Sequence, residues 1–288
     1  MQVIRLKDAM LSSPQAVALG YFDGGHCGHA ELLKKAVLEA KRLGLESAVF
    51  TFSHLPSKGG VPLSTEKERI AFFEEMGIEN VILASFDELC TLSPEEFVSS
   101  VLKNICHARI ALCGFNFRFG YKAAGDSRLL LRLLPESVVL PPTLYKNEPI
   151  SSTRIREALS DGRMQDATEM LGHPYTVTGE VTHGRAIGRS IGFPTANITP
   201  KTLLPRHGVY KTEVRLDGTC YTGLTNVGVC PTVNGENGAR VETFIKDFSG
   251  DAYGKSLSVS FLSFMREENR FASIDELKAQ IAQDLQKL

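Results

Sequence analysis

Two closely spaced histidines follow the first apolar run of the sequence, where glycines are concentrated. The segment is Gly20-Tyr-Phe-Asp-Gly-Gly-His-Cys-Gly-His29, and an amphipathic helical pattern continues to Leu43. A helix N-terminus presents unpaired N–H groups and a positive dipole end to phosphate, and glycines let the phosphate approach the backbone. His26 and His29 would project to the same side and donate hydrogen bonds during substitution at phosphorus. The alternative is two partly exposed histidines beside a glycine turn.

A second candidate phosphate site opens a later helix, Ile150-Ser-Ser-Thr-Arg-Ile-Arg156. The three hydroxyls could be helix caps alone, but two arginines in the same turn oppose the helix dipole unless an anion is bound. The two clusters together are typical of two helix ends that face one triphosphate. Such a site needs no lysine-bearing phosphate loop, and the sequence contains no Gly-x-x-x-x-Gly-Lys-Ser/Thr.

A third cluster is rich in glycine and ends in oxygen-bearing side chains. It runs His183-Gly-Arg-Ala-Ile-Gly-Arg-Ser-Ile-Gly-Phe-Pro-Thr-Ala-Asn197. Its glycines are either turns between strands or a flap that lies against phosphates. The hydroxyl of Thr195 and the amide oxygen of Asn197 are hard ligands that suit Mg²⁺ held jointly with ATP phosphates. Glu242 lies in an alternating strand, where a carboxylate taken alone indicates a solvated outward face.

The elements that must position these clusters fall into two classes. Up to residue 172, short apolar runs alternate with helical patterns, which predicts a doubly wound, Rossmann-like parallel sheet that binds ligands at the carboxyl ends of its strands. The expected strands cover 16–22, 47–52, 81–84 and 110–113, and the expected capping boxes are Thr65 with Glu68 and Ser93 with Glu96. From Tyr175 onward polar and apolar residues alternate, which predicts an antiparallel β-barrel or β-sandwich closed by a helix that Ser273 caps. We therefore expect domains at 1–172 and 173–288.

Composition restricts the function further. The 288 residues include 32 Lys and Arg against 33 Asp and Glu, so the net charge of −1 supplies no field for nucleic acid. The six cysteines form no Cys-x-x-Cys pair, which argues against a structural metal. The N-terminus lacks the apolar core of a targeting segment and no uncharged run is long enough to cross a membrane, so we expect a cytoplasmic protein.

These motifs resemble the prokaryotic bifunctional riboflavin kinase/FAD synthetase family over essentially the whole chain. Phe22-Asp-Gly, His26-x-Gly-His29, Gly114-x-Asn-Phe-Arg-Phe-Gly120 and Ile150-Ser-Ser-Thr-x-Ile-Arg156 fit the adenylyltransferase half. The glycine-rich segment, Gly208-Val-Tyr210, Val241-Glu242 and Arg266-x-Glu-x-Arg-Phe271 fit the kinase half. The resemblance implies phosphorylation of riboflavin to FMN, then transfer of AMP from a second ATP to give FAD and pyrophosphate.

The resemblance also assigns residues to each step. It implies Glu242 as the general base of the kinase and His26 and His29 as catalytic residues of the adenylyltransferase. It places the adenylyltransferase ATP site at Gly20, Phe22, Asp23, Gly24, Gly28, Ser151, Ser152, Thr153 and Arg156. It places the FMN side of that half at Phe52, Pro56 and Asn116. It places the kinase phosphate site at Gly184, Gly188, Arg189, Gly192, Pro194, Thr195 and Asn197, with Mg²⁺ on the last two. Arg266 and Phe271 are its expected flavin or nucleotide contacts.

One loop departs from the family pattern. Phe-Asp-Pro-x-Pro is usual after the second strand, whereas this chain has Phe52-Ser-His-Leu-Pro56. One alternative is therefore that only the kinase half is fully active. Another is a non-enzymatic oligonucleotide-binding barrel, which the neutral charge and the scarcity of aromatic residues beside basic ones argue against. We expect ATP, riboflavin and FMN as partners, no nucleic acid or membrane, and a monomer or weak oligomer.

Overall fold

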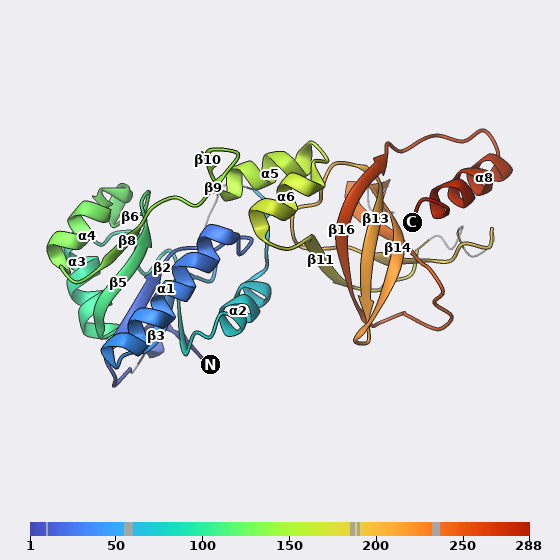
Figure 1. Ribbon diagram of the computed structural model, residues 1–288. Coiled ribbons are helices and arrows are strands. Elements are labelled where there is room, and N and C mark those ends of the chain that lie inside the picture. The colour runs from blue at the N-terminus through green and yellow to red at the C-terminus, as the bar shows by residue number, and fades with distance from the viewer. Residues whose placement is uncertain (10, 55–59, 185–187, 189–190, 232–236) are drawn as a thin grey trace. The chain divides into compact units, whose positions relative to one another are not determined.

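A computed structural model describes the chain except residues 10, 55–59, 185–187, 189–190 and 232–236 (Figure 1). Its contacts divide the chain into two compact units, Met1–Ser152 and Thr153–Leu288. The domain boundary that we expect near residue 172 stays a prediction. No helix in the described part of the chain is long and apolar enough to cross a membrane.

The first unit contains a six-stranded parallel sheet in the order β1-β4-β3-β2-β5-β8. Its elements are β1 (Gln2–Arg5), η1 (Leu6–Asp8), β2 (Gln15–Leu19), α1 (Cys27–Leu43), β3 (Glu46–Phe52), α2 (Glu66–Glu75), β4 (Asn80–Ala84), α3 (Pro94–Glu96), η2 (Phe97–Ile105), β5 (Ala108–Gly114), β6 (Arg118–Phe119), η3 (Tyr121–Ala123), β7 (Gly125–Asp126), α4 (Ser127–Leu133), β8 (Val138–Leu140), β9 (Leu144–Tyr145) and β10 (Glu148–Pro149). The chain runs outward from β2 through β3 to β4 and then returns to the other side of β2. The gap between β2 and β5 is thus a topological switch point, where open α/β sheets bind ligands.

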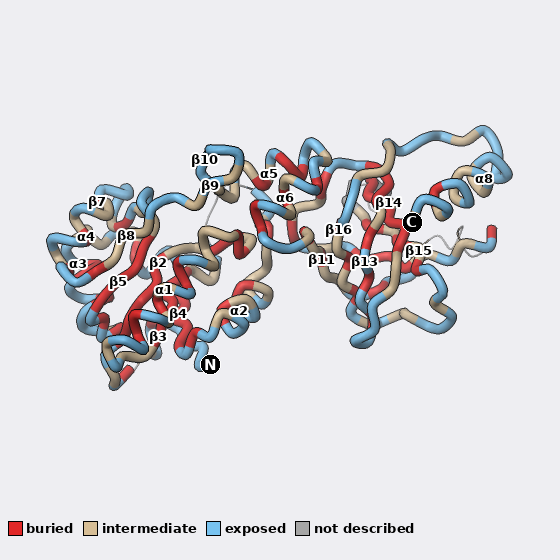
Figure 2. Tube along the Cα trace, in the orientation of Figure 1, coloured by how far each residue is buried: buried red, intermediate tan, exposed pale blue. Residues whose placement is uncertain are grey.

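Alternating side chains of these strands bury two apolar layers, one on each face of the sheet. Val17 and Phe50 belong to the layer that includes η2, whereas Ala18 and Val49 belong to the layer that includes α1 and Phe73 of α2. Figure 2 shows the buried strands between partly exposed helices. Strands buried on both faces require continuous apolar runs, which is why the sequence predicted them. The predicted doubly wound sheet is confirmed.

The helices begin and end where local signals place them. The expected helix from His29 to Leu43 is confirmed and starts at Cys27, because the His26 side chain accepts a hydrogen bond from the His29 N–H and acts as N-cap. Gly44 ends it with a left-handed φ of 67°. Both predicted capping boxes, at Thr65 and at Ser93, are present.

The second unit is a curled antiparallel sheet in the order β11-β16-β13-β14-β15-β12, with a terminal helix. Its elements are α5 (Ser152–Ser160, whose first residue closes the first unit), α6 (Met164–Leu171), β11 (Tyr175–Glu180), β12 (Thr195–Ile198), β13 (Gly208–Leu216), β14 (Thr219–Pro231), β15 (Asn237–Ile245), β16 (Ser256–Arg266) and α8 (Ile274–Leu285). The outer strands meet where the Thr182 N–H donates to the Asn197 carbonyl at 2.8 Å. Gly179 of β11 packs there against Ile198, and a Cβ at position 179 would lie 2.9 Å from the Ile198 Cβ. The predicted barrel with a terminal helix is confirmed.

The interior of this sheet is apolar except for a line of threonines. The hydroxyls of Thr212, Thr225 and Thr243 are fully buried and hydrogen-bonded in series at 2.8 and 2.9 Å. Val227 and Val241 occupy the next inward positions of β14 and β15. Residues between these positions, including Asn226 and Glu242, therefore face outward.

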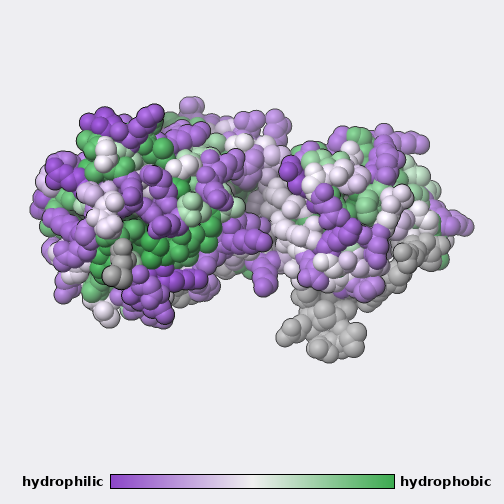
Figure 3. All heavy atoms as spheres, turned by 90° about the horizontal axis from the view of Figure 1, so that it is seen from below, coloured by the Kyte–Doolittle hydropathy of each residue, from purple (hydrophilic) through white to green (hydrophobic). Residues whose placement is uncertain are grey.

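Hydrophilic residues cover much of the face of the molecule shown in Figure 3. On the face seen in Figure 3, hydrophobic residues gather in the middle of the first unit, with hydrophilic residues around them. Exposed apolar side chains such as Leu38 and Val61 are ordinary on soluble proteins, so this patch by itself indicates no partner.

Candidate active sites

The turn that leaves β2 is held open by glycines and by one buried ring. Phe22 adopts a left-handed φ of 61° and is 1% exposed, and the following Gly24 and Gly25 have φ of 80° and 58°. A Cβ at Gly20 would lie 3.0 Å from the buried Phe22 ring, so a larger residue at this strand exit would have to displace the ring slightly. The ring packs edge-on against His29, with centroids 5.2 Å apart. Phe22 is thus a buried packing partner of the His29 ring and is not itself available to a ligand.

Asp23 is buried and bound to backbone. Its carboxylate accepts hydrogen bonds from the N–H groups of Leu63 and Ser64 at 2.9 and 3.1 Å. The Gly24 N–H in turn donates to the Ser64 hydroxyl at 2.9 Å. The carboxylate therefore fixes the segment before α2 to the glycine-containing turn at the carboxyl end of β2, where the sequence predicts a phosphate site.

The two motif histidines form one stacked unit at the start of α1. Their ring centroids lie 3.5 Å apart at an interplanar angle of 15°. The His26 Nδ1 accepts the His29 N–H at 3.3 Å, so the proton of a neutral His26 ring sits on Nε2. The Nδ1 atom of His29 is buried without a hydrogen-bond partner. A Cβ at Gly28 would lie 3.4 Å from the His26 ring, so glycine leaves this side of the pair open.

Burial keeps both rings uncharged at neutral pH. Desolvation lowers the pKa of His26 to about 4, partly opposed by its backbone hydrogen bond. Desolvation, and second the charge of His26, hold the pKa of His29 well below its ordinary value. A bound anion favours the charged form of such rings, so a phosphate beside them raises their pKa. The pair can therefore act as hydrogen-bond donors that gain charge as negative charge develops nearby.

This pairing makes the first unit sensitive to acid. The unfolded chain protonates His26 near its ordinary pKa of 6.5, whereas the folded chain does so only near 4. Between these values the unfolded state binds more protons than the folded state. We therefore expect His26 alone to lower the free energy of unfolding by about 1.4 kcal/mol for each unit by which the pH is lowered from 6.5 to 4. Urea titrations between pH 7 and 4 measure the slope. In His26→Asn, which keeps a good N-cap, the slope should be shallower; an identical slope contradicts the assignment.

The second cluster begins beside the first. The Ser152 hydroxyl donates to the Asp23 carbonyl at 3.1 Å, which ties the start of α5 to the β2 turn. Ser151 precedes that helix, and Thr153 and Arg156 belong to the second unit. Their approach to a shared triphosphate stays a prediction.

Two of the expected FMN-side residues lie at the carboxyl ends of β3 and β5, the strands on either side of β2. Phe52 is the last residue of β3 and its ring lies 6.2 Å from that of Phe86. Asn116 is exposed in the turn after β5, on the other side of the switch point. Pro56 lies outside the described residues.

In the second unit, strand register brings three predicted residues to one face. Asn197 of β12 lies opposite Glu242 of β15, which in turn lies opposite Asn226 of β14. Thr195 shares the Asn197 side of its strand because the two are two residues apart. The predicted Mg²⁺ ligands and the predicted base thus occupy adjacent outward positions.

Asn197 provides an unused acceptor at this face. Its side chain is 5% exposed, its Nδ2 donates to the Thr195 carbonyl at 3.3 Å, and its Oδ1 is buried without a partner. A Cβ at Gly184 would lie 2.6 Å from Nδ2, so only glycine can cover this amide. A buried amide oxygen that lacks a donor fits a hard cation. Among the described residues, no group of three or more His, Cys, Asp or Glu side chains could hold a metal by itself.

The described part of the glycine-rich segment folds into a tight turn over β12. The Phe193 N–H donates to the Gly188 carbonyl at 2.8 Å, and a Cβ at Gly188 would lie 2.3 Å from the Phe193 carbonyl oxygen. Gly192 has a left-handed φ of 89°, and the exposed Pro194 leads into β12. Arg189 lies outside the described residues.

Glu242 itself is accessible. Its side chain is 40% exposed, and Arg240 approaches it at 3.9 Å, a long ion-pair distance. The neighbouring Asn226 amide donates to the Glu268 carboxylate at 2.8 Å. A carboxylate that is only loosely paired can accept a proton from a substrate hydroxyl.

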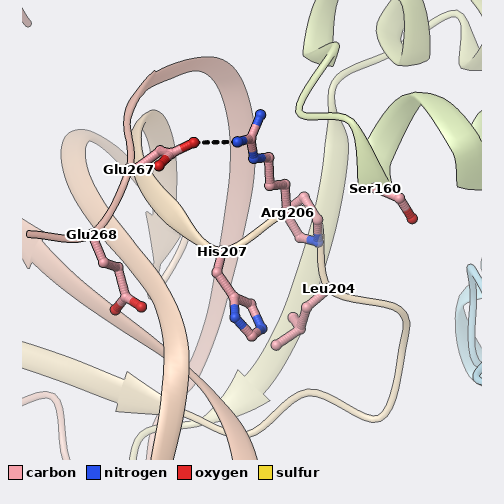
Figure 4. A pocket seen from close by; sticks show the side chains of 7 residues that line it. Ser160, Leu204, Arg206, His207, Glu267 and Glu268 are labelled. Atoms are coloured by element: carbon pink, nitrogen blue, oxygen red, sulfur yellow. Dashed lines mark hydrogen bonds and ion pairs between the residues drawn. The ribbon is translucent and has the colours of Figure 1, made fainter.

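A cavity of about 570 Å³ lies beside this face and contains residues that sequence analysis did not select (Figure 4). Arg206 forms an ion pair with Glu267, and His207 and Glu268 belong to the lining from two separate segments. Its lining is Ser160, Leu204, Pro205, Arg206, His207, Glu267 and Glu268. Of these residues, Glu268 is a specified position of a sequence motif and Glu267 is a variable position of the same motif. The others lie outside the motifs and are brought to the cavity by the fold.

The two expected contacts after β16 differ in their surroundings. The guanidinium of Arg266 donates through Nε and Nη2 to Asp284 of α8, at 2.9 and 2.8 Å, and through Nη1 to the Glu267 carbonyl. Asp284 is 1% exposed, so this pair fastens the terminal helix to the end of β16. Phe271 is half-buried in the segment between them.

Comparisons with known proteins cover both units. The model of the FAD synthetase family matches residues 8–154, and the model of the riboflavin kinase family matches residues 171–288. The bifunctional riboflavin kinase/FMN adenylyltransferase of Listeria monocytogenes is 33% identical, over 94% of this chain and 90% of its own.

Whole-chain similarity extends to a further relative and to a solved structure. The Escherichia coli K12 protein with the same name is 34% identical over 99% of this chain and 96% of its own. A Streptococcus pneumoniae crystal structure, titled as a macrolide-efflux protein, has a TM-score of 0.89 and 33% identity, and the match covers 99% of this chain and 97% of that one. With two family models in tandem and relatives matched along nearly their full length, this chain belongs to the family of bifunctional riboflavin kinases/FMN adenylyltransferases.

Proposed function

We propose that the second unit phosphorylates riboflavin with ATP to give FMN, and that the first unit joins FMN to the AMP part of a second ATP. The observation that supports this most directly is that each unit has its own candidate site for the phosphates of ATP, and that the two sites are built differently. One is the stacked histidine pair at the N-terminus of α1. The other is the face shared by Asn197 and Glu242.

In the kinase step, Glu242 takes the proton of the riboflavin 5′-hydroxyl as its oxygen attacks the γ-phosphorus of ATP. The new bond joins that oxygen to phosphorus, the bond to the β-phosphate oxygen breaks, and ADP leaves. Thr195 and Asn197 would hold Mg²⁺ through side-chain oxygens, and Mg²⁺ when bound neutralises phosphate charge. Support comes from the unpartnered Oδ1 of Asn197 directly across the strand pair from Glu242.

In the adenylyltransferase step, a phosphate oxygen of FMN attacks the α-phosphorus of ATP and pyrophosphate leaves. The Nε2–H of His26 and the ring of His29 stabilise the growing negative charge, together with the N-terminal N–H groups of α1. Because these groups are fixed before the reaction, catalysis rests on positioning and charge stabilisation, without a covalent intermediate on the enzyme. Asn116 and Phe52 lie at the strand ends that flank this site and are the proposed FMN-side contacts.

A coupled product assay tests the proposal. Purified protein given riboflavin, ATP and Mg²⁺ should accumulate FMN first and FAD afterwards, as followed by chromatography with fluorescence detection. Chelation of Mg²⁺ with EDTA should stop FMN formation. A folded protein that yields neither product refutes the proposal, and one that yields FMN but no FAD, even when FMN is supplied, shows that only the kinase half is active.

A further inference from the structure

Arg69 of α2 is an unusually buried cation at the ligand-binding edge of the first unit. It is 3% exposed, and none of the ion pairs between described residues includes it. Its Nε is buried without a hydrogen-bond partner. Burial of a charge that lacks an opposite charge is costly, and so Arg69 is a poor choice for stability alone.

Among the described residues, the polar and ring contacts of the Arg69 side chain are with the segments at the carboxyl ends of two central strands. Its Nη2 donates to the carbonyls of Phe52 and Ser53, at 2.8 and 3.2 Å, where β3 ends. Its guanidinium lies over the ring of Tyr21, 4.3 Å from the centroid, just after β2. One side chain therefore joins the exits of β2 and β3, on the edge where such sheets bind ligands.

The surrounding segments are fixed by other bonds, so Arg69 has a defined position. The Thr51 hydroxyl donates to the Tyr21 carbonyl at 3.2 Å, and the Ser53 N–H donates to the Ala84 carbonyl at 3.0 Å. Asp23 holds the chain just before α2 through Leu63 and Ser64. Arg69, the fourth residue of α2, thus contacts Tyr21 in the segment that leads from β2 to the histidine pair.

We propose that Arg69 is a positioning residue for FMN adenylylation. It holds the segment after β3 in a fixed position relative to the turn after β2. It does so through carbonyl oxygens, which every residue type possesses. The chain can therefore carry Ser53 and His54 at places where the family pattern has other side chains. The inference rests on the proposed function of the first unit.

The test is a comparison of steady-state constants for FMN adenylylation in Arg69→Met and Arg69→Lys. Arg69→Met should raise KM for FMN by about tenfold or more, which corresponds to about 1.4 kcal/mol, with KM for ATP changed by less than about threefold. Arg69→Lys keeps the charge and a donor and should recover part of the loss. Lys67→Met, an exposed change on the same helix, is the matched control and should leave all constants unchanged.

Two further measurements separate positioning from folding. Riboflavin phosphorylation by the second unit should keep its wild-type rate in every variant, and the thermal midpoint of Arg69→Lys should stay near wild type. If Arg69→Met does not fold, Tyr21→Leu removes the ring beneath the guanidinium and should raise KM for FMN in the same direction. Wild-type KM for FMN in the folded variants, or equal losses in both reactions, overturns the inference. Wild-type protein that forms no FAD refutes the proposed function instead.

Discussion

Replacement of Glu242 by glutamine should lower kcat for riboflavin phosphorylation by about 10²–10⁴-fold, the usual contribution of a general base. Glutamine keeps the size of the side chain and its place between Asn197 and Asn226, but it cannot accept the proton of the 5′-hydroxyl. KM for riboflavin should change little, because the lost interaction develops in the transition state. Initial rates of FMN formation, followed by chromatography, measure both constants.

The two-unit architecture supplies the internal control for this variant. FMN provided directly should still be converted to FAD at the wild-type rate, since the histidine pair lies in the first unit. Glu213→Gln, at an exposed outward position of β13, should leave both reactions unchanged. An equal fall in both reactions after Glu242→Gln would mean that one chemistry per unit is the wrong assignment.

The start of α1 could be predicted from sequence because its signals are local. Amphipathic spacing, glycines and a polar residue before the first turn lie within a few positions of one another, and the helix forms where they place it. The function of Asp23 could not be predicted in the same way. Its partners Leu63 and Ser64 lie forty residues further along the chain, and only the packing of α2 brings them to the carboxylate.

The face of the second unit that carries Asn197 and Glu242 shows the same difference between local and long-range information. The sequence placed Thr195 and Asn197 at the end of a glycine-rich turn or flap and did not predict a strand there, whereas the structure has both on one side of β12. Their position beside Glu242 depends on the pairing of β12 with β15, which joins segments almost fifty residues apart in the sequence. The resemblance to a family supplied that residue, whereas a carboxylate in an alternating strand alone would have indicated a solvated face. The cavity beside it was not predicted, because Ser160, Arg206 and Glu267 share no motif.

Replacement of His29 by alanine should lower the rate of FAD formation from FMN by about 10²–10³-fold, the effect of removing one donor from a charge-stabilising site. The imidazole is stacked on His26 and supported by Phe22, so its removal deletes a donor and frees the ring beside it. Pyrophosphate release and FAD fluorescence follow the loss.

The kinase activity of the same variant decides what the loss means. Riboflavin phosphorylation should continue at the wild-type rate, and His173→Gln, at an exposed histidine, should leave both reactions unchanged. If His29→Ala made FAD at the wild-type rate, the stacked pair would be a helix cap and nothing more. If the variant lost both activities and no longer folded, the His29 ring would be needed for the stability of the core. Loss of FAD formation alone, in a folded protein that still makes FMN, assigns the histidine pair to adenylyl transfer, because no other step uses the N-terminus of α1.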